Sequence, residues 1–177
     1  VGSTLYVGGD FSKIDTITRN RLAAIDTLGT TLTWNPNAGG AGTLGSSGVY
    51  TLVVDGATVY VGGNFTTVGG VTRQRFAAVN ITSGALAGAT PQFSGTINAI
   101  TVVGDIVYVG GFFDAVGPAA GGAQLVRTSL AAFNKLSRVL EAWNPNVQST
   151  IFLGTVNALA FANNTLYVGG RIATIDG

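Results

Sequence analysis

The segment Thr58-Val-Tyr-Val-Gly-Gly63 is one of four similar segments in this chain of 177 residues. The other three are Thr4-Leu-Tyr-Val-Gly-Gly9, Ile106-Val-Tyr-Val-Gly-Gly111 and Thr165-Leu-Tyr-Val-Gly-Gly170. Their second glycines lie at positions 9, 63, 111 and 170, so the copies are 54, 48 and 59 residues apart. Similarity at such a period indicates a structural unit that stacks on copies of itself.

The similarity continues after each double glycine. An aromatic or aliphatic residue follows one residue later, at Phe11, Phe65, Phe113 and Ile172. An arginine then leads into an apolar run, in Arg19-Asn-Arg-Leu-Ala-Ala-Ile25, Arg73-Gln-Arg-Phe-Ala-Ala-Val79 and Arg127-Thr-Ser-Leu-Ala-Ala-Phe133. Two copies close with Trp34-Asn-Pro-Asn37 and Trp143-Asn-Pro-Asn146, and the middle copy keeps only Thr90-Pro-Gln92. The shared order of these elements makes the repeat secure.

Each unit offers four short strand candidates separated by turn residues. In the second unit the candidates are Val49–Val54, Thr58–Gly62, Arg75–Asn80 and a weaker Ala85–Ala89. In the third they are Ile97–Val103, Ile106–Gly110, Ser129–Asn134 and Val139–Trp143. The pairs Asp55-Gly56, Gly104-Asp105 and Asn163-Asn164 stand where a two-residue hairpin needs a positive φ.

These patterns predict an all-β fold, a partial β-propeller-type array of four-stranded antiparallel blades with about 50 residues per repeat. Residues 1–48 would form a partial blade, 49–96 and 97–155 two blades, and 156–177 a second partial blade. The two partial blades do not combine into one, because both would supply the Tyr-Val-Gly-Gly strand. We therefore expect further repeats of the same chain, or identical subunits, to cover the end faces.

The pattern resembles that of the kelch blade, in which a double glycine and a spaced aromatic residue are similarly placed. It is more similar to the bacterial delta-60 type repeat, roughly Val-Tyr-Val-Gly-Gly-x-Phe, then Arg and Leu-Ala, then Trp-x-Pro; related repeats occur in fungal cortical polarity-marker proteins. The resemblance covers nearly the whole chain. It departs at the missing Trp of the middle unit and at the insertion Gly117-Pro-Ala-Ala-Gly-Gly-Ala123. It implies a propeller-like fold outside the cell, with no assigned activity.

Composition excludes several classes of function. Charged residues make up 10% of the chain and the net charge is +1, so no electrostatic surface for nucleic acid or an anionic membrane is expected. The apolar runs are too short for a membrane-spanning helix. The chain contains no His and no Cys, which excludes a Ser-His-Asp triad, a cysteine nucleophile and a zinc site with the usual ligands.

The acidic residues do not suggest catalysis. Glu141 is the only glutamate, and the aspartates stand mostly in turn contexts, at positions 10, 15, 26, 55, 105, 114 and 176. We therefore predict a protein that is not an enzyme and has no cofactor. Calcium is the one metal whose oxygen-ligand chemistry stays open. A repeated calcium site is not expected, because the positions equivalent to Asp10 hold Asn64, Phe112 and Arg171.

The repeated residues are interpreted first as structural. The glycines would allow a bend or a close backbone approach, at Gly8, Gly9, Gly62, Gly63, Gly110, Gly111, Gly169 and Gly170. Arg19, Arg73 and Arg127 would donate hydrogen bonds to carbonyls of the Gly-Gly bend, with an anion-binding surface as the alternative. Trp34 and Trp143 would pack between blades, with stacking on a sugar or other ligand as the alternative.

The leading functional hypothesis is a non-enzymatic structural and interaction module of an extracellular or cell-surface protein. Its variable loops, Ala38–Gly48 and Gly117–Gln124, would present a surface for adhesion or assembly. Protein or glycan ligands are the expected partners, with no nucleic acid and no membrane insertion. Two alternatives remain: a glycan-binding propeller that uses Trp34 and Trp143, and a fragment of a propeller enzyme whose catalytic residues lie outside this segment.

Overall fold

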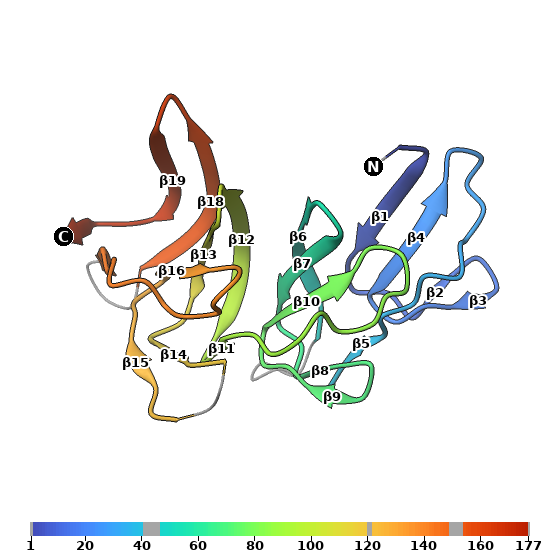
Figure 1. Cartoon of the computed structure of the whole chain (residues 1–177), viewed down its shortest axis with the longest axis horizontal. Coiled ribbons are helices and arrows are strands. Elements are labelled where there is room, and N and C mark those ends of the chain that lie inside the picture. Colours follow the sequence, from blue (N-terminus) through green and yellow to red (C-terminus); the bar gives the residue numbers. More distant parts are fainter. Residues whose placement is uncertain (1, 41–46, 120–121, 149–153, 177) are drawn as a thin grey trace.

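The computed structural model describes residues 2–40, 47–119, 122–148 and 154–176. These residues form antiparallel strands and turns and contain no helix, which confirms the all-β prediction. No helix in the described part of the chain could therefore cross a membrane. Its sheets follow one another in chain order, with β1 (Thr4–Gly8) at the right of Figure 1 and β18 (Thr155–Ala162) at the left. They form an open series rather than a ring.

Four main sheets contain the repeated motif, and each places its Tyr-Val-Gly-Gly strand beside an apolar strand. The second and third are complete at three strands, and the first and fourth have two. Their strands are β1 with β4 (Leu22–Asp26); β6 (Val49–Asp55), β7 (Thr58–Gly63) and β10 (Phe76–Asn80); β12 (Thr96–Val103), β13 (Ile106–Phe112) and β16 (Leu130–Asn134); and β18 with β19 (Thr165–Arg171).

Small sheets at the base of the main ones join successive repeats, and the sequence patterns do not predict them. In three of them, the segment after the proline of one repeat pairs with a strand of the next repeat. These sheets contain β5 (Ala38–Gly39), β8 (Thr67–Val68) and β9 (Val71–Thr72); β11 (Gln92–Phe93), β14 (Ala115–Gly117) and β15 (Leu125–Val126); and β17 (Asn146–Gln148) with β20 (Thr174–Asp176). The hairpin of β2 (Lys13–Ile14) and β3 (Ile17–Thr18) is a further small sheet, and it lies within the first repeat. Backbone hydrogen bonds thus link each repeat to its neighbour.

The predicted fourth strands, Ala85–Ala89 and Val139–Trp143, do not form. Each is reduced to a single bridge, Val79 with Leu86 and Phe133 with Leu140. The chain turns sharply before each bridge, because the side-chain Oδ1 of Asn80 accepts the backbone N–H groups of Thr82 and Ser83. In the equivalent turn of the third repeat, Asn134 Oδ1 accepts the backbone N–H groups of Leu136 and Ser137. The predicted four-stranded blade is therefore not confirmed: the sheets of the described residues have two or three strands.

The core lies between the sheets rather than within one of them. The largest cluster joins the second and third repeats and contains a chain of aromatic rings, with Phe76 and Phe133 edge to face at 5.3 Å and Phe93 and Phe113 at 5.0 Å. A similar cluster joins the first and second repeats around Phe65. Among the described residues, the cluster between the third and fourth repeats contains three buried side chains, Leu130, Val147 and Val156. Each repeat is thus stabilised mainly by the next.

Candidate interaction surfaces

In three of the four pairs, the first glycine lies beneath the first strand of the following repeat. A Cβ atom added to Gly62 would lie 2.5 Å from Ile97 Cγ2, and one on Gly8 would lie 2.6 Å from Val49 Cγ1. A Cβ on Gly110 would collide with Val156 in the same way. At Gly169, by contrast, the nearest atom is Ala158 Cβ, at an ordinary 3.8 Å. The surface over Gly169 is therefore open where the other copies are covered.

The second glycine faces the strand that precedes it in its own hairpin. A Cβ on Gly63, Gly111 or Gly170 would collide with the carbonyl oxygen of Gly48, Thr96 or Thr155 respectively. The pairing shifts at this point in all three complete hairpins, for example between Ile97 and Ala99 opposite Gly111 and Gly110. Gly9 differs, since its closest neighbour is the Phe11 ring at 3.2 Å. The first glycine thus allows the next repeat to approach closely, and the second allows close contact with the preceding strand of the same hairpin.

The repeated arginines bond to carbonyls, but not to those predicted. Each donates from Nη1 to the carbonyl of the preceding residue. Each also donates from Nη2 into the segment of the missing fourth strand: Arg19 to Leu32, Arg73 to Gly88 and Arg127 to Glu141, at 2.6, 3.2 and 3.1 Å. The predicted bonds to the Gly-Gly bend are therefore wrong. The guanidinium groups instead bond to carbonyls of the segment where a fourth strand was expected.

A different residue holds the Gly-Gly bend, and the sequence gives little sign of it. Arg21, Arg75 and Ser129 occupy one repeat position and have φ values of 63°, 68° and 61°. The backbone carbonyl of each accepts a hydrogen bond from the N–H of the second glycine. Its backbone N–H donates to the carbonyl of Phe11, Phe65 or Phe113, and all these bonds are 2.9 to 3.1 Å long. A positive φ is uncommon for arginine and serine, so the residue types do not predict this backbone conformation. Only a comparison of the three copies could have drawn attention to this position.

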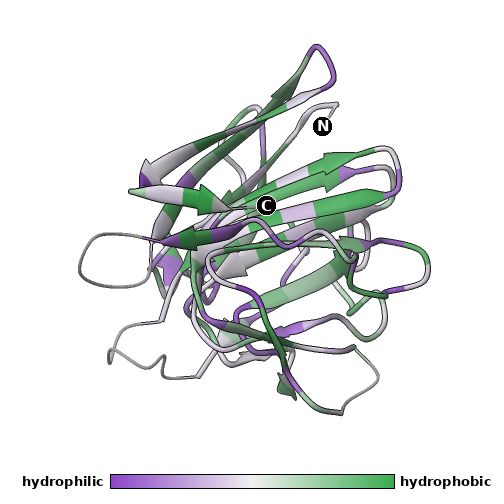
Figure 2. Ribbon diagram, turned by 90° about the vertical axis from the view of Figure 1, so that its left-hand side faces the viewer, coloured by the Kyte–Doolittle hydropathy of each residue, from purple (hydrophilic) through white to green (hydrophobic). Residues whose placement is uncertain are grey.

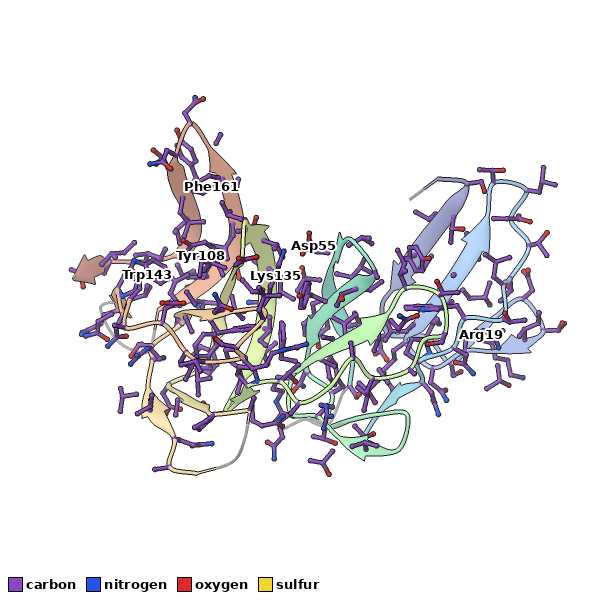
Figure 3. All side chains as sticks on the ribbon, in the orientation of Figure 1. Arg19, Asp55, Tyr108, Lys135, Trp143 and Phe161 are labelled. Carbon is purple, nitrogen blue, oxygen red and sulfur yellow. The ribbon has the colours of Figure 1, made fainter. Side chains whose placement is uncertain are left out.

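The two tryptophans have different environments. Trp34 is 4% exposed; its indole N–H donates to the carbonyl of Asn80 at 3.0 Å, and its ring meets Tyr6 edge to face at 5.0 Å. A ligand cannot stack on it, so that alternative fails for Trp34. Trp143 meets Tyr108 in the same edge-to-face manner at 5.4 Å but is 38% exposed (Figure 3). Only Trp143 offers a ring face to a ligand or a partner.

Three charged side chains, Lys135, Asp55 and Asp105, lie together between the turns of the second and third repeats. Lys135 Nζ lies 2.8 Å from an Asp55 carboxylate oxygen and 3.8 Å from one of Asp105 (Figure 3). The hydrogen bond to Asp55 is the main cause that raises the pKa of Lys135, against the lowering effect of desolvation. Within the described ranges no group of three acidic, His or Cys side chains could hold a metal ion. The cluster has the character of an ion-pair link between repeats.

The two predicted variable loops are only partly visible in the structure. Residues 41–46 of the first and 120–121 of the second lie outside the described residues. Of the second loop, Pro118 and Ala119 follow β14 directly, and Leu125 begins β15. These residues line an apolar cavity of about 400 Å³ together with Ala89 and residues 137–140. The loop therefore takes part in a concave surface at the junction of the second and third repeats.

No protein-family model and no curated protein matches this sequence. Among solved structures, the chain is similar to a computationally designed protein called Ika8, with a TM-score of 0.52 and 16% sequence identity. The match covers 98% of this chain and 48% of the designed one, so this chain spans about half the length of that protein. At this level of identity the similarity concerns the fold alone.

Proposed function

We propose that this chain is a section of a β-propeller-type repeat array of the delta-60 or kelch-like kind. In this proposal it acts as a non-catalytic structural and interaction module of an extracellular or cell-surface protein. The array is a rigid body in which each repeat is completed by the next. The loops that differ between copies meet the partner. Support comes from the repeated motif and from cores that lie between repeats.

The observation that supports assembly most directly is the uncovered face of the β18–β19 hairpin. Positions that the following repeat buries elsewhere are open here: Gly169 lacks a close neighbour, Tyr167 is 53% exposed and Phe161 36%. Figure 2 shows the molecule from the side that carries this hairpin, with apolar segments along the strands. Exposed apolar surface of this kind is typical of an interface. A further repeat of the same type, in the same chain or in an identical subunit, fits it.

Light scattering after size exclusion tests the assembly part of the proposal. The chain should self-associate in a concentration-dependent manner, since the open face is the same surface that packs on a neighbour elsewhere. A Gly169→Val variant should remain folded and become monomeric, because a branched side chain there would obstruct the incoming strand. A chain that is monomeric at every concentration, or a variant that associates equally well, would contradict assembly through this face.

A glycan-binding module is the second candidate, and the exposed Trp143 ring favours it. An aromatic face beside exposed polar side chains such as Asn144 is able to stack on a sugar ring. A glycan array separates the two candidates. Binding that disappears on Trp143→Ala would support the glycan site, whereas a blank array would leave assembly through the β18–β19 hairpin as the proposed role.

A further inference from the structure

The outer edge of β19 has no partner strand within the described residues. Its counterparts β7 and β13 each pair on both sides, with the first strand of the repeat on one side and the third strand on the other. β19 pairs only with β18. An unpaired edge presents a row of backbone N–H and C=O groups to an incoming strand. The place of a third strand beside β19 is therefore open.

The second glycine of each pair shows the same difference. In the first three repeats its N–H donates to the carbonyl of the residue before the third strand, as Gly63 does to Arg75 at 3.0 Å. Gly170, the fourth copy, makes no such bond among the described residues. Its N–H adds a further donor to the open edge of β19.

The β18–β19 hairpin packs on the third repeat as the β6–β7 hairpin packs on the first. A Cβ on Gly8 would meet Val49 of β6, and one on Gly110 would meet Val156 at the equivalent place in β18. The first interface, which we define as the contact between the first and second repeats, therefore indicates what fits beside β19.

Two side chains at the first interface hold the end of the third strand. The Trp34 indole N–H donates to the carbonyl of Asn80, the last residue of β10, at 3.0 Å. The Tyr6 hydroxyl donates to the carbonyl of the next residue, Ile81, at 3.1 Å. The two rings meet edge to face at 5.0 Å. This Tyr–Trp pair thus binds two successive backbone carbonyls of the following repeat.

The third repeat contains the same Tyr–Trp pair. Tyr108 and Trp143 meet edge to face at 5.4 Å, at the end of the molecule that carries β18 and β19 (Figure 3). Neither the Tyr108 hydroxyl nor the Trp143 indole N–H has a hydrogen-bond partner in the part of the chain that the structure describes. Trp143 is 38% exposed, compared with 4% for Trp34. Two side-chain donors thus lie where the end of a third strand would be.

We propose that the outer edge of β19 and the Tyr108–Trp143 pair form a binding site for an extended strand of a partner polypeptide. The strand has the pattern shared by β4, β10 and β16: two central alanines, an apolar residue on either side of them, and Asp or Asn at the end. The proposal deepens the proposed interaction role, but it uses the edge of the hairpin rather than the face over Gly169.

The register of the bound strand follows from the way β10 pairs with β7. The strand runs antiparallel to β19, with its first residue opposite Gly169 and its last opposite Thr165. The Gly170 N–H donates to the carbonyl before the strand. At the other end, the last carbonyl of the strand accepts from Trp143 and the next carbonyl accepts from Tyr108.

A folded second copy of the chain does not supply this strand. The third strands of the chain are buried and paired in their own sheets; Leu22, Ala23 and Ala24 of β4, for example, are at most 1% exposed. Releasing one of them would expose its apolar side chains and break its strand pairing. The donor is therefore a strand that is unpaired in its own protein.

A synthetic peptide of residues 75–84 tests the proposal, because it contains β10 and the two carbonyls that the Tyr–Trp pair of the first repeat binds. It should bind the whole chain with one-to-one stoichiometry in isothermal titration calorimetry. In NMR spectra the Trp143 indole N–H signal should shift and exchange more slowly with solvent, and the Trp34 signal should not change. A control peptide with Ala77→Pro and Ala78→Pro should not bind, because proline lacks the N–H needed for strand pairing.

Tyr108→Phe and Tyr6→Phe form a matched pair of variants. Each loses one hydroxyl, but only Tyr108 belongs to the site. Tyr108→Phe should therefore weaken peptide binding roughly three- to tenfold, the usual size for one hydrogen bond, and Tyr6→Phe should leave it unchanged. Gly169→Val obstructs the face and not the edge, so it should remove self-association and keep peptide binding. The two proposals can thus fail separately.

Three results would overturn the proposal. The first is the absence of peptide binding in a chain that is folded by circular dichroism. The second is binding that shifts the Trp34 signal and not the Trp143 signal, or that has the same affinity in the two tyrosine variants. The third is a glycan that binds at Trp143 when the peptide does not, which would assign this ring to the glycan-binding module.

Discussion

The β12–β13 and β18–β19 hairpins have the same design in different surroundings. Both pair with the same register and the same shift, between Ile97 and Ala99 in one and Val156 and Ala158 in the other. Val107 and Val109 are fully buried in the first hairpin, whereas their counterparts Leu166 and Val168 are only half-buried in the second. The local sequence thus determines the hairpin, and the neighbouring repeat determines how much of it is buried. Substitutions at matched positions should therefore have unequal effects along the chain.

The tryptophan pair should show the largest difference. Trp34→Ala removes a buried ring and an indole hydrogen bond between repeats, so the free energy of unfolding should fall by about 3–5 kcal/mol. Trp143→Ala removes a partly exposed ring whose main ring contact is Tyr108, and should cost about 1 kcal/mol. Urea unfolding followed by circular dichroism measures both. Equal losses would show that the face of Trp143 is buried in solution.

The glycine pair should give a smaller contrast in the same direction. Gly62→Val forces a branched side chain against Ile97 and should lower the free energy of unfolding by about 1–3 kcal/mol. Gly169→Val meets only Ala158 at a normal distance, so its effect on the monomer should be well under 1 kcal/mol. Thermal unfolding at low protein concentration, where association is weak, is the appropriate measurement. A destabilised Gly169→Val variant would mean that its hairpin is covered.

The strands of the second and third repeats could be predicted closely from the sequence. The predicted Val49–Val54, Thr58–Gly62 and Ile97–Val103 are observed as Val49–Asp55, Thr58–Gly63 and Thr96–Val103. Alternating apolar residues and Asp-Gly turns are local signals, which is why these predictions hold. The double glycines could also be predicted as close approaches, although not that the two approaches differ.

The features that could not be predicted depend on contacts between repeats. The fourth strand was expected from an apolar run, but Asn80 and Asn134 form turns before it and the arginines bond to its carbonyls. The contact of Trp34 with Gly84 joins residues about 50 positions apart, and strand periodicity gives no information at that distance.

The ion pair of Lys135 should give the smallest effect, and it adds a pH dependence to the contact between the second and third repeats. Asp55 raises the pKa of Lys135 above its ordinary value of 10.5. The stabilisation is therefore fully present below that value and is lost as the pH rises through the raised pKa.

Lys135→Met should lower the free energy of unfolding slightly at neutral pH, and the difference between the variant and the unsubstituted chain should shrink in alkaline solution and in high salt. Lys13→Met is the control, because Lys13 is exposed and makes no ion pair among the described residues. A Lys135→Met difference that stays constant across this pH range would show that the charge of Lys135 does not stabilise the contact between the two repeats.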